Sequence, residues 1–208
     1  MKNNFFHKLR IIWQRPIVIV VTGLGRETTS LAIRQVLQNH FTIGKKVLLY
    51  STDSPDSADF AFLVKKARMA LLVATHTGQY EQEKEFFSGS APDVAKIAKL
   101  VNLLVAKDRL VFNFDDETVR DLKNQSPTLS LAFGFAARAD VRATDIVLTE
   151  SNTNFKINYQ GNTVPVWLPN LFGKEEIYAA LAAATVGEIL DLNLVEISES
   201  LKLTKSIF

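Results

Sequence analysis

Five short apolar runs, each separated from the next by a stretch of helical length, constrain the fold of this chain more than any other feature. A continuous apolar run is expected of a strand that is buried on both faces of a sheet. Strands joined by helices pair in parallel, through right-handed crossovers. The sequence therefore predicts an α/β fold whose mostly parallel sheet is flanked by helices. The five runs cover residues 17–23, 45–51, 69–76, 109–115 and 129–135.

The pattern changes after the fifth run. Residues 145–169 alternate apolar and polar side chains in steps of two, and Gly161-Asn162 interrupts them as a hairpin turn would. A small antiparallel sheet, within about residues 141–169, is therefore expected beside the parallel one. An alanine-rich helix and a second helix follow, and alanine permits helices to pack closely.

The composition suits one globular domain, or one domain with a small appendage. Of 208 residues, 47% are hydrophobic, which is enough for a sizeable core. The net charge of +2 is too small to favour binding to nucleic acid. The chain has no cysteine for a thiolate metal site, and its three scattered histidines do not indicate a zinc centre. The apolar runs are too short to span a membrane.

Residues 1–15 are predicted to form an amphipathic helix that precedes a domain of residues 16–208. Apolar side chains within residues 5–13 fall on one face, with lysine and arginine around them. One interpretation is peripheral contact with an anionic membrane surface. The other is packing against the domain itself or against a partner. The short apolar face favours packing, because membrane attachment needs more than one weak signal.

The segment VVTGLGRETTS, residues 20–30, has the layout of a phosphate-binding loop. Apolar strand residues lead to Gly23, a short turn follows, and two threonines and a serine open a helix. In such loops, backbone N–H groups and a lysine hold phosphate. Glu27 stands where the lysine is expected. The sequence thus predicts a P-loop-type sheet whose loop carries a charge of the wrong sign.

Four longer stretches carry a family resemblance. They are NFDDETVRDL at residues 113–122, LAFGFAARADVRATDI at 131–146, FKINYQGNTVPVWLP at 155–169, and IYAALAAATVGEILDLNLVEISESL at 177–201. In this order they resemble the central, ATP-binding domain of the Mur ligase family, which builds the peptide stem of peptidoglycan. The likeness is greatest to the members that add D-alanyl-D-alanine to the UDP-N-acetylmuramoyl tripeptide. It implies one of the family's three domains, without the UDP-sugar-binding and C-terminal ones.

The resemblance implies nucleotide-binding positions in the loop, vestigial in this chain, at Gly23, Gly25, Arg26, Glu27, Thr28 and Thr29. The family's lysine falls on Glu27. Two like charges about 4 Å apart repel by about 4 kcal/mol at an effective dielectric constant of about 20. Arg26 replaces the glycine before the lysine. It could supply a positive charge, but it adds bulk where the backbone approaches phosphate.

The family's metal-binding and catalytic positions are also altered. A magnesium-binding glutamate falls on Leu49, which cannot ligate a hard cation, and Asp53 nearby fits a turn better than a ligand. A histidine near the family's second metal falls near Glu81, which would bind a cation alone. Lys99 best matches a lysine that is often carbamylated in the family, with Lys96 close by as an alternative. A solvated surface lysine is the other interpretation. His76, a lone histidine at a strand end, is expected to be structural.

Asn113 matches an asparagine that contacts adenine in the family. Asp115 and Asp116 follow it at the C-terminal end of a strand, where open parallel sheets bind ligands. One of the two could also cap the next helix. The family's His-Asn pair and second asparagine, at the start of the alanine-rich helix, are replaced by Glu175, Glu176 and Ala179. An acidic pair favours a helix N-terminus but not an anionic nucleotide.

These changes are concentrated where phosphate, metal and base would be touched, while the positions that build the fold match. The sequence therefore favours a homologue without catalysis or cofactor, which binds a protein such as a Mur ligase or another cell-wall enzyme. Its expected place is the cytoplasm or the inner membrane surface. The alternative is the ATP-binding part of an ATP-dependent acid–amino acid ligase, with Mg²⁺ and with other domains in trans. A third hypothesis is a nucleotide sensor without hydrolysis.

Overall fold

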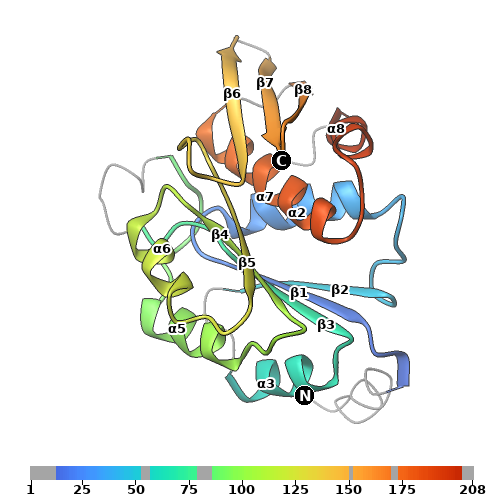
Figure 1. Ribbon diagram of the computed structural model, residues 1–208, viewed down its shortest axis with the longest axis vertical. Helices are drawn as coiled ribbons and strands as arrows, with labels where there is room; N and C mark the ends of the chain where they lie inside the picture. The colour runs from blue at the N-terminus through green and yellow to red at the C-terminus, as the bar shows by residue number, and fades with distance from the viewer. Residues whose placement is uncertain (1–12, 53–56, 79–85, 150–151, 170–172, 203–208) are drawn as a thin grey trace.

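The computed structural model describes residues 13–52, 57–78, 86–149, 152–169 and 173–202 (Figure 1). Most of the predicted N-terminal helix, together with Asp53 and Glu81, lies outside the described residues. The described part forms one sheet with helices on both faces, so the predicted α/β class is confirmed. None of its helices is long and apolar enough to cross a membrane.

The sheet has eight strands in the order β2-β1-β3-β4-β5-β6-β7-β8. The pairs from β2 to β6 are parallel, and the last two pairs are antiparallel. The predicted apolar runs form the first five strands. The strands are β1 (Ile17–Thr22), β2 (Val47–Ser51), β3 (Met69–Ala74), β4 (Arg109–Asn113), β5 (Leu129–Gly134), β6 (Val141–Leu148), β7 (Asn152–Tyr159) and β8 (Asn162–Pro169).

The antiparallel strands continue the parallel sheet instead of forming a second one. Strands β5 and β6 pair at only two positions, Phe133 with Val141 and Gly134 with Arg142, because a short turn leads directly from one strand to the other. From there β6 runs past the end of β5 and pairs with β7. The β7–β8 hairpin turns at Gln160 and Gly161, one residue earlier than predicted. Both residues have positive φ, 48° and 81°, as the tight turns that match strand twist require.

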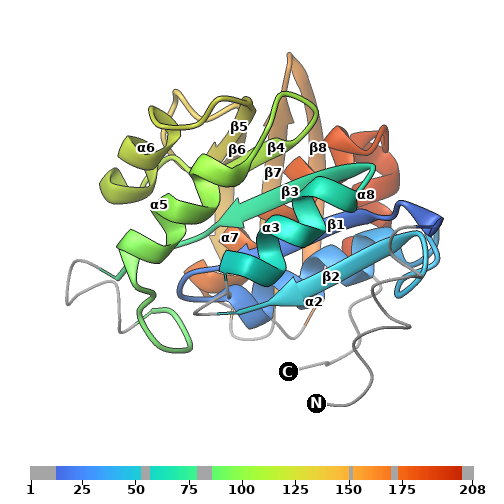
Figure 2. The same cartoon turned by 90° about the horizontal axis from the view of Figure 1, so that it is seen from below.

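Alternate residues of the central strands enter two separate cores. Ile19 and Val21 of β1 face one core, while Val18 and Val20 face the other. The first core lies under α2, α7 and α8, and the second under α3, α5 and α6, which Figure 2 shows on the side nearer the viewer. The helices are α2 (Arg26–Leu37), α3 (Ser57–Lys66), α5 (Val94–Leu103), α6 (Glu117–Lys123), α7 (Lys174–Ile189) and α8 (Leu194–Lys202).

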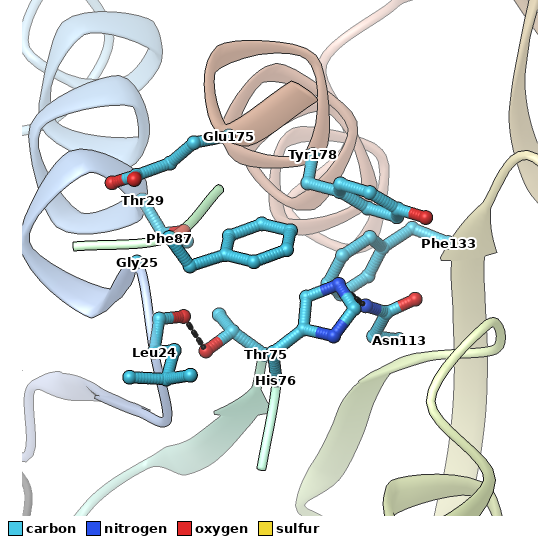
Figure 3. A pocket seen from close by; sticks show the side chains of 10 residues that line it. All are labelled: Leu24, Gly25, Thr29, Thr75, His76, Phe87, Asn113, Phe133, Glu175 and Tyr178. Carbon is cyan, nitrogen blue, oxygen red and sulfur yellow. Dashed lines mark hydrogen bonds between the residues drawn. The ribbon is translucent and has the colours of Figure 1, made fainter. Parts of the chain in front are cut away.

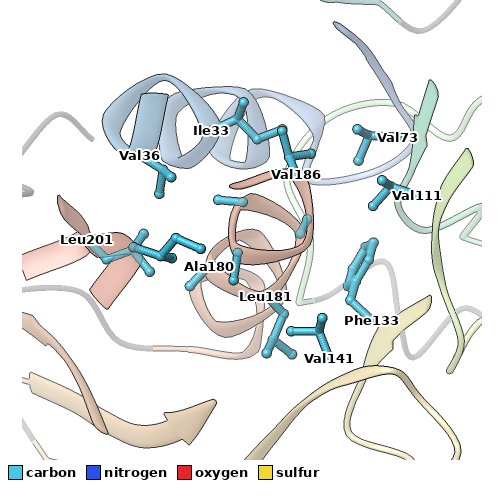
Figure 4. Close-up of a cluster of buried hydrophobic side chains, with 14 of the residues drawn as sticks. Ile33, Val36, Val73, Val111, Phe133, Val141, Ala180, Leu181, Val186 and Leu201 are labelled. Carbon is cyan, nitrogen blue, oxygen red and sulfur yellow. The ribbon is translucent and has the colours of Figure 1, made fainter. Parts of the chain in front are cut away.

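Helix α7, the alanine-rich helix, is buried along nearly its whole length. Every residue from Ile177 to Gly187 is buried, so the helix has no polar face, as expected for a helix enclosed by its domain. It lies between α2 and the strands, with Val36 and Leu201 on one side and Phe133 and Val141 on the other (Figure 4). The small alanine side chains permit this close approach.

The tightest contact of α7 is at Gly187. A Cβ atom on Gly187 would lie 2.8 Å from Ile197 Cδ1 of α8 and 3.3 Å from Val36 Cγ1 of α2. Three helices therefore meet at a position where there is no room for a side chain.

We expect Gly187→Val to lower the free energy of unfolding by about 1–3 kcal/mol, because the new methyl groups must displace both neighbours. Urea denaturation measures the change. The control is Ala95→Val on the exposed surface of α5, for which we expect a loss of less than about 1 kcal/mol. Equal losses in the two variants would contradict the packing described for α7.

Candidate functional site

The predicted strand–turn–helix lies where the order of the sheet reverses. The chain passes from β1 to β2 on one side and then to β3 on the other, so the carboxyl ends of β1 and β3 flank the loop. Gly23 has φ 115°, and a Cβ atom there would overlap Thr75 Oγ1. That hydroxyl donates a hydrogen bond to Leu24 O at 2.6 Å. Open α/β sheets bind ligands at such a switch point, so this loop is the candidate site.

Glu27 reaches the end of β2. Its side chain is 69% exposed, and its carboxylate accepts a hydrogen bond from Ser51 Oγ at 2.7 Å and lies 4.0 Å from Arg26 Nε. Arg26 does not replace the lysine either. Its guanidinium donates to Gly23 O at 3.2 Å and to Ser90 O at 3.1 Å. Arg26 thus fastens residues 86–90, here called the covering segment, to the loop.

A carboxylate from a distant helix occupies the space over the loop. Glu175, at the start of α7, accepts hydrogen bonds from Thr28 Oγ1, from Ser88 N at 2.7 Å and from Ser88 Oγ at 2.7 Å. A Cβ atom at Gly25 would lie 3.4 Å from Glu175 Cγ, so the glycine permits this approach. Gly25 N donates to Ser88 O at 2.8 Å. Figure 3 shows the Glu175 side chain reaching from α7 toward the start of α2.

Aromatic rings fill the adjoining space. Phe87 of the covering segment lies against His76, with ring centroids 4.0 Å apart, and Tyr178 meets His76 edge-on at 4.9 Å. Phe135 packs on the other side of Tyr178 at 4.4 Å. Within these residues a cavity of only about 10 Å³ remains, about the space that one water molecule needs. This cavity is too small for a nucleotide.

His76 lies against Asn113, the last residue of β4, and against Asp116, which follows that strand. Asn113 Nδ2 lies 2.7 Å from His76 Nε2, and both residues are at most 3% exposed. Since an amide nitrogen can only donate, Nε2 accepts and the ring proton lies on Nδ1. That nitrogen is 3.6 Å from Asp116 Oδ2. The amide of Asn113, predicted to contact adenine, is therefore directed toward a protein ring.

Asp116 is the aspartate that caps the next helix. Its Oδ1 accepts from Val119 N at 2.9 Å, and its Oδ2 accepts from Thr77 N at 2.7 Å and Thr77 Oγ1 at 2.8 Å. Burial on its own would raise the pKa of Asp116. The nearby His76 ring and the hydrogen bonds from Thr77 and Val119 together outweigh burial and hold the pKa of Asp116 below its ordinary value.

Asp115 joins three elements at the same edge of the sheet. Its carboxylate accepts from Phe135 N at 2.6 Å, from Ala136 N at 3.0 Å and from Tyr178 OH at 2.8 Å. It therefore positions the aromatic ring of α7 over the end of β5.

The two glutamates at the start of α7 differ in surroundings. Glu175 is hydrogen-bonded in the loop, whereas burial, and secondly repulsion by Glu175, raise the pKa of Glu176 despite a hydrogen bond from its own backbone N–H. Ala179, one turn further on, is buried at 1% exposure. Of Glu175, Glu176 and Ala179, Glu175 is therefore the residue that contacts the loop. The sequence did not predict its contacts with Thr28 and Ser88.

The remaining predicted residues lie apart from the loop. Lys99 is exposed on α5, a helix that covers the opposite face of the sheet from α7. Leu49 is half-buried in the middle of β2, against the first core. Thr29 is buried in the first turn of α2, where its N–H donates to Gly25 O at 2.9 Å. Among the described residues, no group of three acidic or histidine side chains could hold a metal ion.

An open, mostly parallel sheet with a loop–helix at its switch point defines a nucleotide-binding type of α/β domain. The family model described as the Mur ligase middle domain matches residues 85–187. The chain is 27% identical over 197 residues to the UDP-N-acetylmuramate--L-alanine ligase of Hydrogenobaculum sp. (strain Y04AAS1), covering 89% of this chain and 40% of that protein. The enzyme of the same name from Xanthomonas campestris pv. campestris (strain B100) is also 27% identical, over 84% of this chain and 39% of its own length. The chain is therefore similar to Mur ligases over most of its length, and to their middle domain over residues 85–187.

Solved structures agree on the fold. MurF from Acinetobacter baumannii superposes with a TM-score of 0.76 at 14% identity, over 96% of this chain and 48% of that one. MurF ligase from Thermotoga maritima in complex with ADP superposes with a TM-score of 0.68 at 17% identity, over 92% and 50%. The chain spans about 40% of the length of the curated relatives it matches. The family resemblance and the predicted central-domain fold are therefore confirmed.

We expect Asp116 to make the free energy of unfolding depend on pH in the acidic range. Because its pKa is lower in the folded chain than in the unfolded chain, it contributes stability at pH values above its ordinary pKa of about 3.8, and this is lost as the pH falls through the lower folded pKa. Asp116→Asn should lower the free energy of unfolding at pH 7 by about 1–3 kcal/mol, because an amide group cannot accept from both Thr77 and Val119.

Thermal unfolding between pH 7 and pH 3 measures this dependence. The loss of Tm in acid should be smaller in Asp116→Asn than in the unchanged protein. Asp121→Asn, at an exposed position of the same helix, is the control and should follow the unchanged protein at each pH. Parallel pH curves for all three proteins would contradict the role given to Asp116.

Proposed function

We propose that this chain is a non-catalytic Mur ligase homologue that acts as a binding partner in peptidoglycan synthesis. The observation that carries the proposal is the carboxylate of Glu175 over the loop, held by Thr28 and Ser88. The groups that would meet a phosphate are thus engaged within the protein. The partner we propose is a Mur ligase or another cell-wall enzyme in the cytoplasm, with residues 5–13 as a contact to that partner or to the inner membrane surface.

Electrostatics supports the proposal. A phosphate in the loop would lie close to Glu175, and Glu27 supplies no positive charge in place of the family's lysine. At an effective dielectric constant of about 20, each pair of unit charges about 4 Å apart contributes about 4 kcal/mol. The change from lysine to glutamate at position 27 removes an attraction of this size, and the exposed carboxylate of Glu27, bonded to Ser51, supplies none in its place. Arg26 does not restore the balance, since its guanidinium is bound to Gly23 O and Ser90 O.

The lack of free space over the loop also supports the proposal that the chain is non-catalytic. ATP would have to displace the covering segment, whose Phe87 is 8% exposed and packs against His76. It would also have to replace the hydrogen bonds from Thr28 and Ser88 to Glu175. Hydrogen bonds to a charged group contribute about 1.5–3 kcal/mol each. The free energy of binding would be reduced by the cost of this opening.

An alternative is that the chain is the ATP-binding part of an ATP-dependent acid–amino acid ligase whose other domains act in trans, with ATP and Mg²⁺ as cofactors. Two observations favour it: Thr28 and Asn113 are retained at the loop and at the end of β4, and the chain matches only about 40% of its ligase relatives. Under this alternative, the missing domains would open the covering segment.

We expect titration calorimetry of the whole chain with Mg-ATP to show no binding tighter than about 1 mM, because the loop lacks positive charge and is covered. A complete Mur ligase, titrated under the same conditions, is the positive control. A micromolar Kd for this chain would contradict the proposal. ADP release after addition of the separate missing domains and their substrates would establish the alternative, provided that Thr28→Ala abolishes it.

A further inference from the structure

We propose that Glu175 is a built-in anion, which takes the place of a phosphate in the loop and holds α7 and the covering segment closed over the start of α2. The inference deepens the proposed function, on which it rests in part, because it explains how a phosphate-type loop can remain folded without a ligand.

The geometry around the carboxylate resembles the coordination of a bound anion. Thr28 Oγ1, Ser88 N and Ser88 Oγ converge on its two oxygens, from two elements that are far apart in sequence. Convergent N–H and O–H donors are what anion sites in proteins provide. Gly25 lets the carboxylate stem approach the backbone of the loop to within contact distance. An alanine at position 25 would be strained, because φ is 70° there.

The position of the carboxylate also fits its charge. Helix α2 has 12 residues, and the N-terminus of such a helix carries a partial positive charge that favours anions. Thr28, which donates to Glu175, lies in the first turn of this helix. Glu176 is a natural comparison, since it stands next in the chain but its charged form is disfavoured by burial. Two adjacent carboxylates at one helix start therefore have different surroundings, and only Glu175 is described with donors from the loop and the covering segment.

The covering segment is fastened from three sides. Glu175 holds Ser88, Arg26 holds Ser90 through its main-chain oxygen, and the ring of Phe87 packs between His76 and Tyr178. Gly25 N donates to Ser88 O, so the loop itself also binds the segment. Removal of Glu175 would take away the one anionic partner among these contacts and leave the donors of Thr28 and Ser88 without their acceptor.

The test compares thermal unfolding of the whole chain with Glu175→Ala and with the control Glu176→Ala, which removes the neighbouring carboxylate from the same helix end. We expect Glu175→Ala to lower Tm by about 4–10 °C, because hydrogen bonds to a charged group are lost. Glu176→Ala should leave Tm unchanged or raise it at pH 7, since ionisation of Glu176 opposes folding. Equal losses of Tm in the two variants would overturn the inference.

Inorganic phosphate separates a built-in anion from an ordinary structural contact. At about 50 mM and constant ionic strength, phosphate should raise the Tm of Glu175→Ala by about 2–5 °C more than that of the unchanged protein, as expected for a ligand that binds only the folded state with a Kd of a few millimolar. The unchanged protein corrects for the general stabilising effect of phosphate. Equal shifts in both proteins would overturn the inference.

Two further variants keep the test informative if Glu175→Ala fails to fold. Glu175→Gln retains the shape of the side chain and should lose less Tm, while Ser88→Ala removes one donor and should lose about 2–4 °C. In the double variant Ser88→Ala, Glu175→Gln the losses should be smaller than their sum, since both remove the same contact. Additive losses would contradict the inference.

Failure of these tests, with no binding of Mg-ATP, would leave the proposed function intact. Micromolar binding of Mg-ATP together with rescue by phosphate would reject the proposed function and keep the built-in anion.

Discussion

The burial of α7 from Ile177 to Gly187 is the constraint on which the other parts of the structure depend. Because α7 has no exposed face between Ile177 and Gly187, α2, α8 and the strands must all pack against it, and its alanines set how closely they approach. The same packing fixes where the helix begins. Its first turn comes to lie at the carboxyl edge of the sheet, beside the loop after β1. Glu175 and Tyr178 therefore lie beside the loop because the packing of the buried part of α7 fixes the position of its first turn.

At this edge, groups of the protein satisfy one another in a place where related folds hold a ligand. Asn113 binds His76, Asp116 binds Thr77 and caps α6, and Glu175 binds Thr28 and Ser88. Each contact satisfies a buried or half-buried polar group that would otherwise need water or a ligand. The retention of Thr28 and Asn113 does not require a nucleotide, since both have a function within the fold.

Much of the fold could be predicted from the sequence, because it depends on local patterns. Apolar runs and helical spacing identified β1 to β5 and the helices between them, and the strand–Gly–helix layout identified the loop. The turn from β5 to β6 was missed, since no helix separates these parallel strands. At the site, the substitution at Glu27 was evident, but its contact with Ser51 was not. Glu175 and Ser88 are 87 residues apart, and no periodicity in sequence connects them. Only the packing of α7 on α2 brings them together.

The different surroundings of Glu27 and Glu175 bear on how such a chain can evolve. Glu27 is largely exposed, and its contacts with Ser51 and with the neighbouring Arg26 lie at the surface, so its replacement by lysine would disturb little of the fold. Glu175 is part of a contact that joins three elements, and its loss would be selected against for stability alone. Restoring the lysine at position 27 would thus cost little stability, but it would not by itself restore a phosphate site. If the chain works by binding a partner, the contact of Glu175 opposes a return to nucleotide chemistry, because that return requires a less stable intermediate protein.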